Sequence, residues 1–247
     1  MTNKVAIIGG TGVDKFASWE FVDKRARGTD YGAPSSAIET YRCMGEEFHF
    51  LARHGRPHHI APHCINYRAN LRILHDLGVG RIIAINSVGG IAVDAAAGAV
   101  IIPDQIIDYT YGREHTFFAG DTAPVQHVEF TEPYSQLLRM GLLQAATSAG
   151  VKVMDGGVYG AVQGPRLETA AEIRRMERDG CTIVGMTGMP EAVLARELAM
   201  DYAALCVVVN AAAGKSAEPL TIEAMQAAMS SALADIEKIL LAFFARR

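Results

Sequence analysis

The sequence predicts an α/β fold: a central mixed β-sheet, partly barrel-like, flanked by helices in a single domain spanning residues 1–247. Short apolar runs alternate with amphipathic segments along the whole chain, which is typical of this fold class. Hydrophobic residues make up 50% of the chain and charged residues 20%, so a full core can be buried. No composition break, internal repeat or low-complexity segment divides the 247 residues.

Six apolar runs rich in β-branched or aromatic residues predict the strands. They span residues 5–8, 48–51, 81–85, 100–102, 182–184 and 204–209. Helical spacing before the stop at Gly78 predicts a helix, with apolar residues at Ile65, Ala69, Ile73 and Leu77. Pro190 suits the first turn of another helix, with Glu191 near the positive end of its dipole.

Two further segments complete the prediction. An Ala-, Met- and Leu-rich stretch, residues 221–244, predicts a long C-terminal helix. Residues 110–133 form the longest irregular region, and loops of that length are usually functional or disordered.

Bulk properties exclude several classes of protein. The net charge of −4 and a pI of about 6.1 give no basic surface for nucleic acid. No apolar stretch is long enough to cross a membrane, and the N-terminus lacks a signal-peptide pattern. The cysteines form no CxxC pair, so we expect reduced thiols and a cytoplasmic location; they are Cys43, Cys64, Cys181 and Cys206.

The segment VVVNAAAGKS, residues 207–216, ends like a phosphate-binding P-loop. That motif needs a glycine five positions before Gly214, and the β-branched Val209 stands there instead. The P-loop interpretation therefore fails. Asn210 remains as a polar side chain directly after an apolar run, where ligand-contacting residues of α/β folds are found.

Residues 9–12, GGTG, follow the first predicted strand. A dinucleotide fingerprint would need a third glycine at position 15, which is Lys15. The backbone N–H groups of this turn and the Thr11 hydroxyl suit an anion. The alternative is a tight structural turn.

The segment ARHGRPHHIAPH, residues 52–63, raises a metal hypothesis. Two His-x3-His pairs occur, His54/His58 and His59/His63. That spacing brings ligands together only on a helix, which Gly55, Pro57 and Pro62 would disrupt, so we predict no metal site. Arg53 and His54 are expected instead on a polar turn after a strand, where a guanidinium matches phosphate geometry.

Two more strand ends carry polar groups. Asn86 and Ser87 precede paired glycines without forming a nucleophile elbow, so they indicate anion binding or a simple turn. Met186 and Thr187 lie between a predicted strand and a helix. Thr187 could cap that helix or bind an anion at its N-terminus, and Met186 could be core or contact an apolar ligand. Together the four strand ends predict one phosphate pocket.

These segments, in this order, resemble the nucleoside phosphorylases of the trimeric purine class, most closely the methylthioadenosine phosphorylase branch. The resemblance covers nearly the whole chain through residues 7–12, 51–56, 66–67, 69–70, 164–166, 186–187 and 190–191. It implies that phosphate is held by Thr11, Arg53, His54, Asn86, Ser87 and Thr187, and that Met186 lies against the ribose. The Asn86-Ser87 pair departs from the family's usual Thr-Ala.

The resemblance also implies the chemistry. Phosphate, a co-substrate, attacks the anomeric carbon of a purine nucleoside through an oxocarbenium-like transition state, with no metal, cofactor or covalent intermediate. Positioning and electrostatics carry most of the catalysis. His127 matches a histidine that a neighbouring subunit lends to the pocket, so the resemblance predicts a homotrimer.

The base-binding segment departs from the adenine-specific branch, which has aspartates where this chain has Asn210 and Ala212. An amide can donate to a 6-oxo group or N7, so Asn210 is the predicted catalytic residue, beside Ala211 and Ala212. Ile222 matches an apolar residue of the methylthio-binding pocket. These features predict S-methyl-5′-thioinosine as the nucleoside. The alternatives are the methylthioadenosine and general 6-oxopurine activities, or a non-catalytic purine nucleoside binding protein.

Overall fold

The computed structural model describes residues 4–10, 13, 16–120, 123–216 and 222–246, with the side chains of the last helix described from residue 227 onward. The strands are β1 (Lys4–Gly9), β2 (Glu20–Arg25), β3 (Ile38–Cys43), β4 (Glu46–Ala52), β5 (Val79–Gly90), β6 (Val100–Ile102), β7 (Gln105–Asp108), β8 (Val153–Asp155), β9 (Val158–Ala161), β10 (Ile183–Gly185) and β11 (Asp201–Ala211). The helices are the short 3-10 helix η2 (Pro62–Cys64), α1 (Tyr67–Asp76), α2 (Gln136–Ser148), α3 (Ala170–Arg178), α4 (Gly188–Glu197) and α5 (Ile222–Phe244).

The strands form one mixed sheet in the order β2-β3-β4-β1-β5-β10-β9-β7, with β11 joining β5 to β6 and β6 joining β8. The sheet branches at β5. The first part of this strand pairs parallel with β1, Gly89 and Gly90 pair antiparallel with β10, and β11 pairs parallel with β5 from Arg81 to Gly90. The predicted mixed α/β sheet is therefore confirmed.

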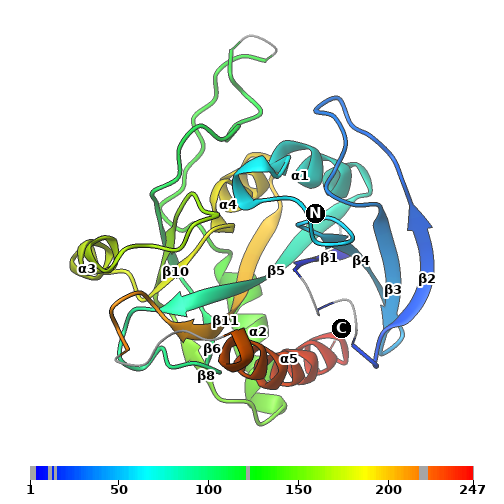
Figure 1. Ribbon diagram of the computed structural model, residues 1–247. Helices are drawn as coiled ribbons and strands as arrows, with labels where there is room; N and C mark the ends of the chain where they lie inside the picture. The colour runs from blue at the N-terminus through cyan, green and yellow to red at the C-terminus, as the bar shows by residue number, and fades with distance from the viewer. Residues whose placement is uncertain (1–3, 11–12, 14–15, 121–122, 217–221, 247) are drawn as a thin grey trace.

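Helices cover both faces of the sheet (Figure 1). On one face α2 and α5 pack through Leu142 and Ile236 against the side chains of β1, β5 and β11. On the other face α1 and α4 contribute Leu71 and Leu194 to a second cluster. The long strands β5 and β11 are buried on both faces, which explains their nearly continuous apolar sequences.

All six predicted strands are present, and the predicted helices correspond to α1, α4 and α5. Asn66 begins α1 by accepting a hydrogen bond from the Ala69 N–H, and Gly78 follows its end with a φ of 78°. Residues 110–133 contain no helix or strand in their described part and project from the body (Figure 1). Among the described helices, none is long and apolar enough to cross a membrane.

Two strands are longer than predicted, which changes the setting of three candidate residues. Asn86 and Ser87 lie inside β5, and Asn210 lies inside β11, instead of directly after these strands. The pairing of β11 with β5 shifts between Val208 and Asn210, which leaves Val209 as an extra residue. Such a β-bulge changes the direction in which the following side chains point.

Candidate active site

A cavity of about 490 Å³ opens where β4, β5, β10 and β11 approach α4 and α5. It brings together six of the candidate residues, which lie far apart in the sequence: Arg53, His54, Ser87, Met186, Thr187 and Asn210. Asn86, His127, Ala211 and Ala212 are not among its lining residues. Thr11 and the side chain of Ile222 lie outside the part of the chain that the structure describes.

Arg53 lies in the turn directly after β4, as expected, but its side chain is buried, with only 1% of the residue exposed. Its Nε and Nη2 each donate to a carboxylate oxygen of Glu191 at 2.8 Å, and Nη1 donates to the Ile85 carbonyl at 3.0 Å. Burial acts to lower the pKa of Arg53, but Glu191 raises it above its ordinary value. The guanidinium that lines the cavity is therefore already paired with a carboxylate.

Glu191 completes this buried network from the first turn of α4. It is fully buried and also accepts a hydrogen bond from the Tyr202 hydroxyl at 2.9 Å. A buried carboxylate needs such partners because its desolvation is otherwise costly. The sequence indicated Glu191 only as a residue near a helix N-terminus. Its pairing with Arg53 spans 138 positions and carries no local signal.

His54 is half-buried, and its ring stacks on His58 with 4.3 Å between ring centroids. Its Nδ1 lies 2.8 Å from the Ile60 carbonyl, which can only accept, so Nδ1 carries the proton and Nε2 remains an acceptor. Burial, together with the charges of Arg53 and His58, lowers the pKa of His54 to about 4. The imidazole is therefore neutral at pH 7. No group of three or more His, Cys, Asp or Glu side chains that could hold a metal occurs within the described ranges.

The alternation of β5 separates two neighbouring candidates. Ser87 is exposed to the cavity, whereas Asn86 points the other way and is only 2% exposed. The Asn86 amide donates from Nδ2 to Thr187 Oγ1 at 2.8 Å. Thr187 occupies the N-cap of α4 but makes no side-chain capping hydrogen bond, so the capping alternative is wrong.

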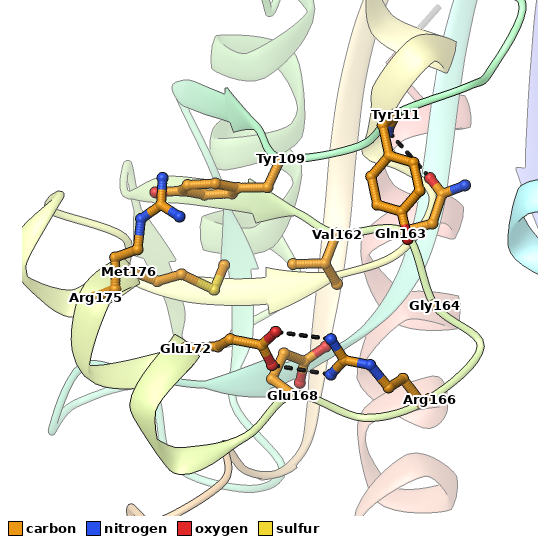
Figure 2. Close-up of a pocket in the computed structure, with 10 residues that line it drawn as sticks. All are labelled: Tyr109, Tyr111, Val162, Gln163, Gly164, Arg166, Glu168, Glu172, Arg175 and Met176. Carbon is orange, nitrogen blue, oxygen red and sulfur yellow. Dashed lines mark hydrogen bonds and ion pairs between the residues drawn. The ribbon is translucent and has the colours of Figure 1, made fainter.

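The cavity contains one polar residue that the sequence analysis missed, Glu168. Asn210 lines the cavity together with Glu168, which follows the Gly164–Arg166 turn. Glu168 also lines an adjoining cavity of about 190 Å³ (Figure 2). Burial raises the pKa of the Glu168 carboxyl. A sequence signal for Glu168 was available, because this carboxylate closely follows residues 164–166, a segment that carries the family resemblance.

Ala211 and Ala212, predicted beside the base, do not line the cavity. The Ala212 N–H donates to the Gly90 carbonyl at 2.8 Å, which continues the pairing of β11 beyond its last residue. The Ala212 methyl group is 3% exposed and packs in an apolar cluster with Ile91 and Met176. Ala211 is exposed, and its carbonyl accepts a hydrogen bond from Asn210 Nδ2 at 2.7 Å.

The same cavity has an apolar wall. Val13, Val209 and two residues of α5, Met229 and Leu233, line it and belong to or pack against the cluster on that face of the sheet. His127 lies on the projecting loop and is exposed. The arrangement therefore combines hydroxyl groups, a neutral imidazole and a paired guanidinium with an amide, a carboxylate and an apolar surface.

Comparison with known proteins agrees with this architecture. Residues 4–245 match the family model described as the phosphorylase superfamily. A probable S-methyl-5′-thioinosine phosphorylase of Pseudomonas syringae pv. tomato is 48% identical over 95% of this chain and 96% of its own length. A 6-oxopurine nucleoside phosphorylase of Pyrococcus furiosus is 43% identical over 97% of this chain and 91% of its own.

A solved structure shows the same fold. Methylthioadenosine phosphorylase from Schistosoma mansoni, in complex with adenine, superposes with a TM-score of 0.91 at 30% sequence identity, covering 98% of this chain and 91% of that protein. The resemblance seen in the sequence motifs is thus confirmed over nearly the full length. The chain belongs to the phosphorylase superfamily.

Proposed function

We propose that this protein catalyses the phosphorolysis of S-methyl-5′-thioinosine to hypoxanthine and 5-methylthioribose 1-phosphate. The observation that carries the proposal is the composition of one cavity, in which Asn210 and Glu168 accompany the apolar Met229 and Leu233. The names of the similar proteins support the same substrate class. Inorganic phosphate is the co-substrate, and the reaction requires no cofactor.

Phosphate binds at the end of the cavity formed by Arg53, His54, Ser87 and Thr187, with Thr11 as a further ligand. The hydroxyl groups of Ser87 and Thr187 can donate hydrogen bonds to an anion. Because Glu191 neutralises Arg53, the site holds phosphate through directed hydrogen bonds more than through net positive charge. These contacts align a phosphate oxygen with the anomeric carbon.

Departure of the base places negative charge on the purine, and a preorganised donor stabilises that charge. Asn210 donates from its amide to O6 or N7 without needing to be protonated. An ionised Glu168 accepts a hydrogen bond from the N1–H of a 6-oxopurine. A 6-aminopurine has a lone pair at N1 and would repel that carboxylate. The pair therefore discriminates in favour of hypoxanthine.

The sugar is held between Met186 and the apolar wall. A 5′-methylthio group fits against Met229 and Leu233, whereas a 5′-hydroxyl buried there would lose its hydrogen bonds to water. This contact selects the methylthio nucleoside over inosine.

The test compares kcat/KM for three nucleosides at saturating phosphate. We expect S-methyl-5′-thioinosine to exceed S-methyl-5′-thioadenosine and inosine by at least about tenfold each, since each mismatch removes about 1–3 kcal/mol of contact energy. Equal or faster turnover of the adenine compound would make the protein a methylthioadenosine phosphorylase. Equal or faster turnover of inosine would make it a general 6-oxopurine enzyme, and binding without product would make it a binding protein.

The projecting loop supports a homotrimer in which His127 enters the neighbouring pocket. The base of the loop is anchored because Glu197 accepts hydrogen bonds from the Thr116 hydroxyl and the Phe117 N–H, both at 2.7 Å. Its outer part is exposed, including Val125. Sedimentation should give a trimer, and a fully active monomer would contradict this assembly. The four unpaired cysteines support a cytoplasmic location.

A further inference from the structure

Arg113 makes an unusual set of contacts at the start of the projecting loop. It is only 9% exposed, and six hydrogen bonds surround its guanidinium. The acceptors are the carbonyls of Val162, Gln163, Met186 and Met189, the Gln163 side chain and the Tyr67 hydroxyl. The guanidinium also lies over the Tyr67 ring, 5.5 Å from its centroid.

All of these acceptors are uncharged. None of the ion pairs found among the described residues includes Arg113, although a buried cation is normally paired with a carboxylate. Arg139 is a useful comparison, since it is buried and donates to the Pro103 and Ile102 carbonyls but also pairs with Asp155 at 2.6 Å. The contacts of Arg113 therefore fix backbone positions rather than neutralise a charge.

The backbone segments that Arg113 joins line two adjoining cavities. Val162 and Gln163 precede Gly164, and all three line the small cavity of Figure 2, whereas Met186 lines the main cavity. Gly164 packs directly on Met186, because a Cβ added at Gly164 would lie 2.5 Å from the Met186 sulfur. Arg113 thus holds the carbonyls of Gln163 and Met186, which flank this contact.

The phosphate side of the same turn has two contacts that do not involve Arg113. The Thr187 hydroxyl accepts from the Asn86 amide at 2.8 Å, and its backbone nitrogen lies 3.4 Å from the Tyr159 hydroxyl. The Met186 carbonyl, in the same peptide group as the Thr187 N–H, accepts from Arg113 at 2.9 Å. Because the Thr187 side chain keeps its bond to Asn86, removal of Arg113 should displace the Met186 side chain more than the Thr187 hydroxyl.

We propose that Arg113 is a positioning residue for the sugar of the nucleoside, acting through Met186 and the Gly164 turn. This inference rests on the proposed function, in which Met186 contacts the ribose. It predicts that loss of Arg113 weakens binding of the nucleoside but not binding of phosphate. The reason is that a misplaced side chain affects only the ligand that it contacts.

The experiment compares Arg113→Met with the matched control Arg139→Met, since both remove a buried guanidinium that donates to carbonyls. Steady-state rates are measured with S-methyl-5′-thioinosine and phosphate varied in turn, and Tm is measured for each protein. We expect Arg113→Met to raise the nucleoside KM at least about tenfold while the phosphate KM stays within about twofold. Arg139→Met should lower Tm and leave both KM values within about twofold of wild type.

Arg113→Lys provides a second variant that keeps the charge but offers a single nitrogen, so we expect an intermediate rise in nucleoside KM. Calorimetric titration with S-methyl-5′-thioinosine and with hypoxanthine needs no turnover. Arg113→Met should raise the Kd of the nucleoside at least about tenfold. It should raise the Kd of the free base, which lacks the sugar, less than about twofold. An unchanged ratio of the two affinities, or equal effects of the two Met variants, would overturn the inference. A wild-type protein that turns over no nucleoside would instead refute the proposed function alone.

Discussion

The buried pair of Arg53 and Glu191 allows a direct test of how burial determines the contribution of an ion pair to stability. Glu191→Gln keeps the shape of the side chain but leaves the Arg53 charge unpaired at a site that is 1% exposed. Removing one partner of a buried ion pair costs about 3–5 kcal/mol. At about 2–4 °C per kcal/mol for a chain of this length, the loss lowers Tm by about 6–20 °C.

Arg166 and Glu172 provide the control (Figure 2). This pair is also bidentate, at 2.9 and 2.7 Å, but its side chains are 68% and 42% exposed. An exposed ion pair contributes about 0–1 kcal/mol, so Glu172→Gln should lower Tm by less than about 4 °C. The glutamine oxygen can still accept the Thr169 N–H hydrogen bond of the α3 capping box.

Differential scanning calorimetry of the two variants and the wild type, at pH 7 and equal protein concentration, measures both shifts. A double variant, Arg53→Met with Glu191→Leu, should recover part of the loss, because it removes both charges and leaves apolar groups of similar size. The recovery is incomplete because the buried Tyr202 hydroxyl and Ile85 carbonyl lose their partners. The phosphate KM of this double variant should be higher than that of the wild type, since the cavity loses the guanidinium. Equal Tm changes for Glu191→Gln and Glu172→Gln would refute the dependence on burial.

Three further predictions concern other parts of the site. The folded state disfavours protonated His54, so its contribution to Tm is present above the unfolded pKa of about 6.5 and is lost as pH falls toward about 4; a His54→Gln variant measured across pH 4–7 should show a shallower decline than wild type. Glu168→Gln should reduce the kcat/KM ratio of methylthioinosine to methylthioadenosine at least about tenfold, and an unchanged ratio would remove Glu168 from base recognition. Ala212→Asp should lower Tm by several degrees because it buries a carboxylate among apolar side chains, and a Tm equal to wild type would place residue 212 in solvent.

Much of the fold follows from local patterns in the sequence. The apolar runs of β1, β4, β5, β6, β10 and β11 and the helical spacing of α1 identify elements whose burial is nearly complete. The prediction missed two helices, α2 and α3, and five strands, β2, β3, β7, β8 and β9. Most of these strands are short or exposed and α3 is strongly charged, whereas β3 is mostly buried. Such elements depend on neighbours supplied by tertiary structure and carry a weaker local signal.

The site was predictable where a polar residue lies near the end of an apolar strand, as with Arg53 and Asn210. It was not predictable where function depends on side-chain direction or on distant partners. The separation of Asn86 from Ser87 requires knowing that β5 continues to Gly90. The contacts of Arg113 with Met186 and Gln163 join segments 50 to 73 positions apart, and no local pattern indicates them.

The contact between Asn86 and Thr187 biases the hydrogen bonding of the cavity. The Asn86 N–H occupies one of the two lone pairs of the Thr187 oxygen, so the hydroxyl proton is free to point toward the cavity and only one lone pair is left to accept from a ligand. A ligand atom that accepts a hydrogen bond, such as an ionised phosphate oxygen, is therefore favoured at this position. The bias comes from an amide that does not line the cavity, so a change at position 86 can alter which atoms are preferred in front of Thr187 while the cavity keeps its shape.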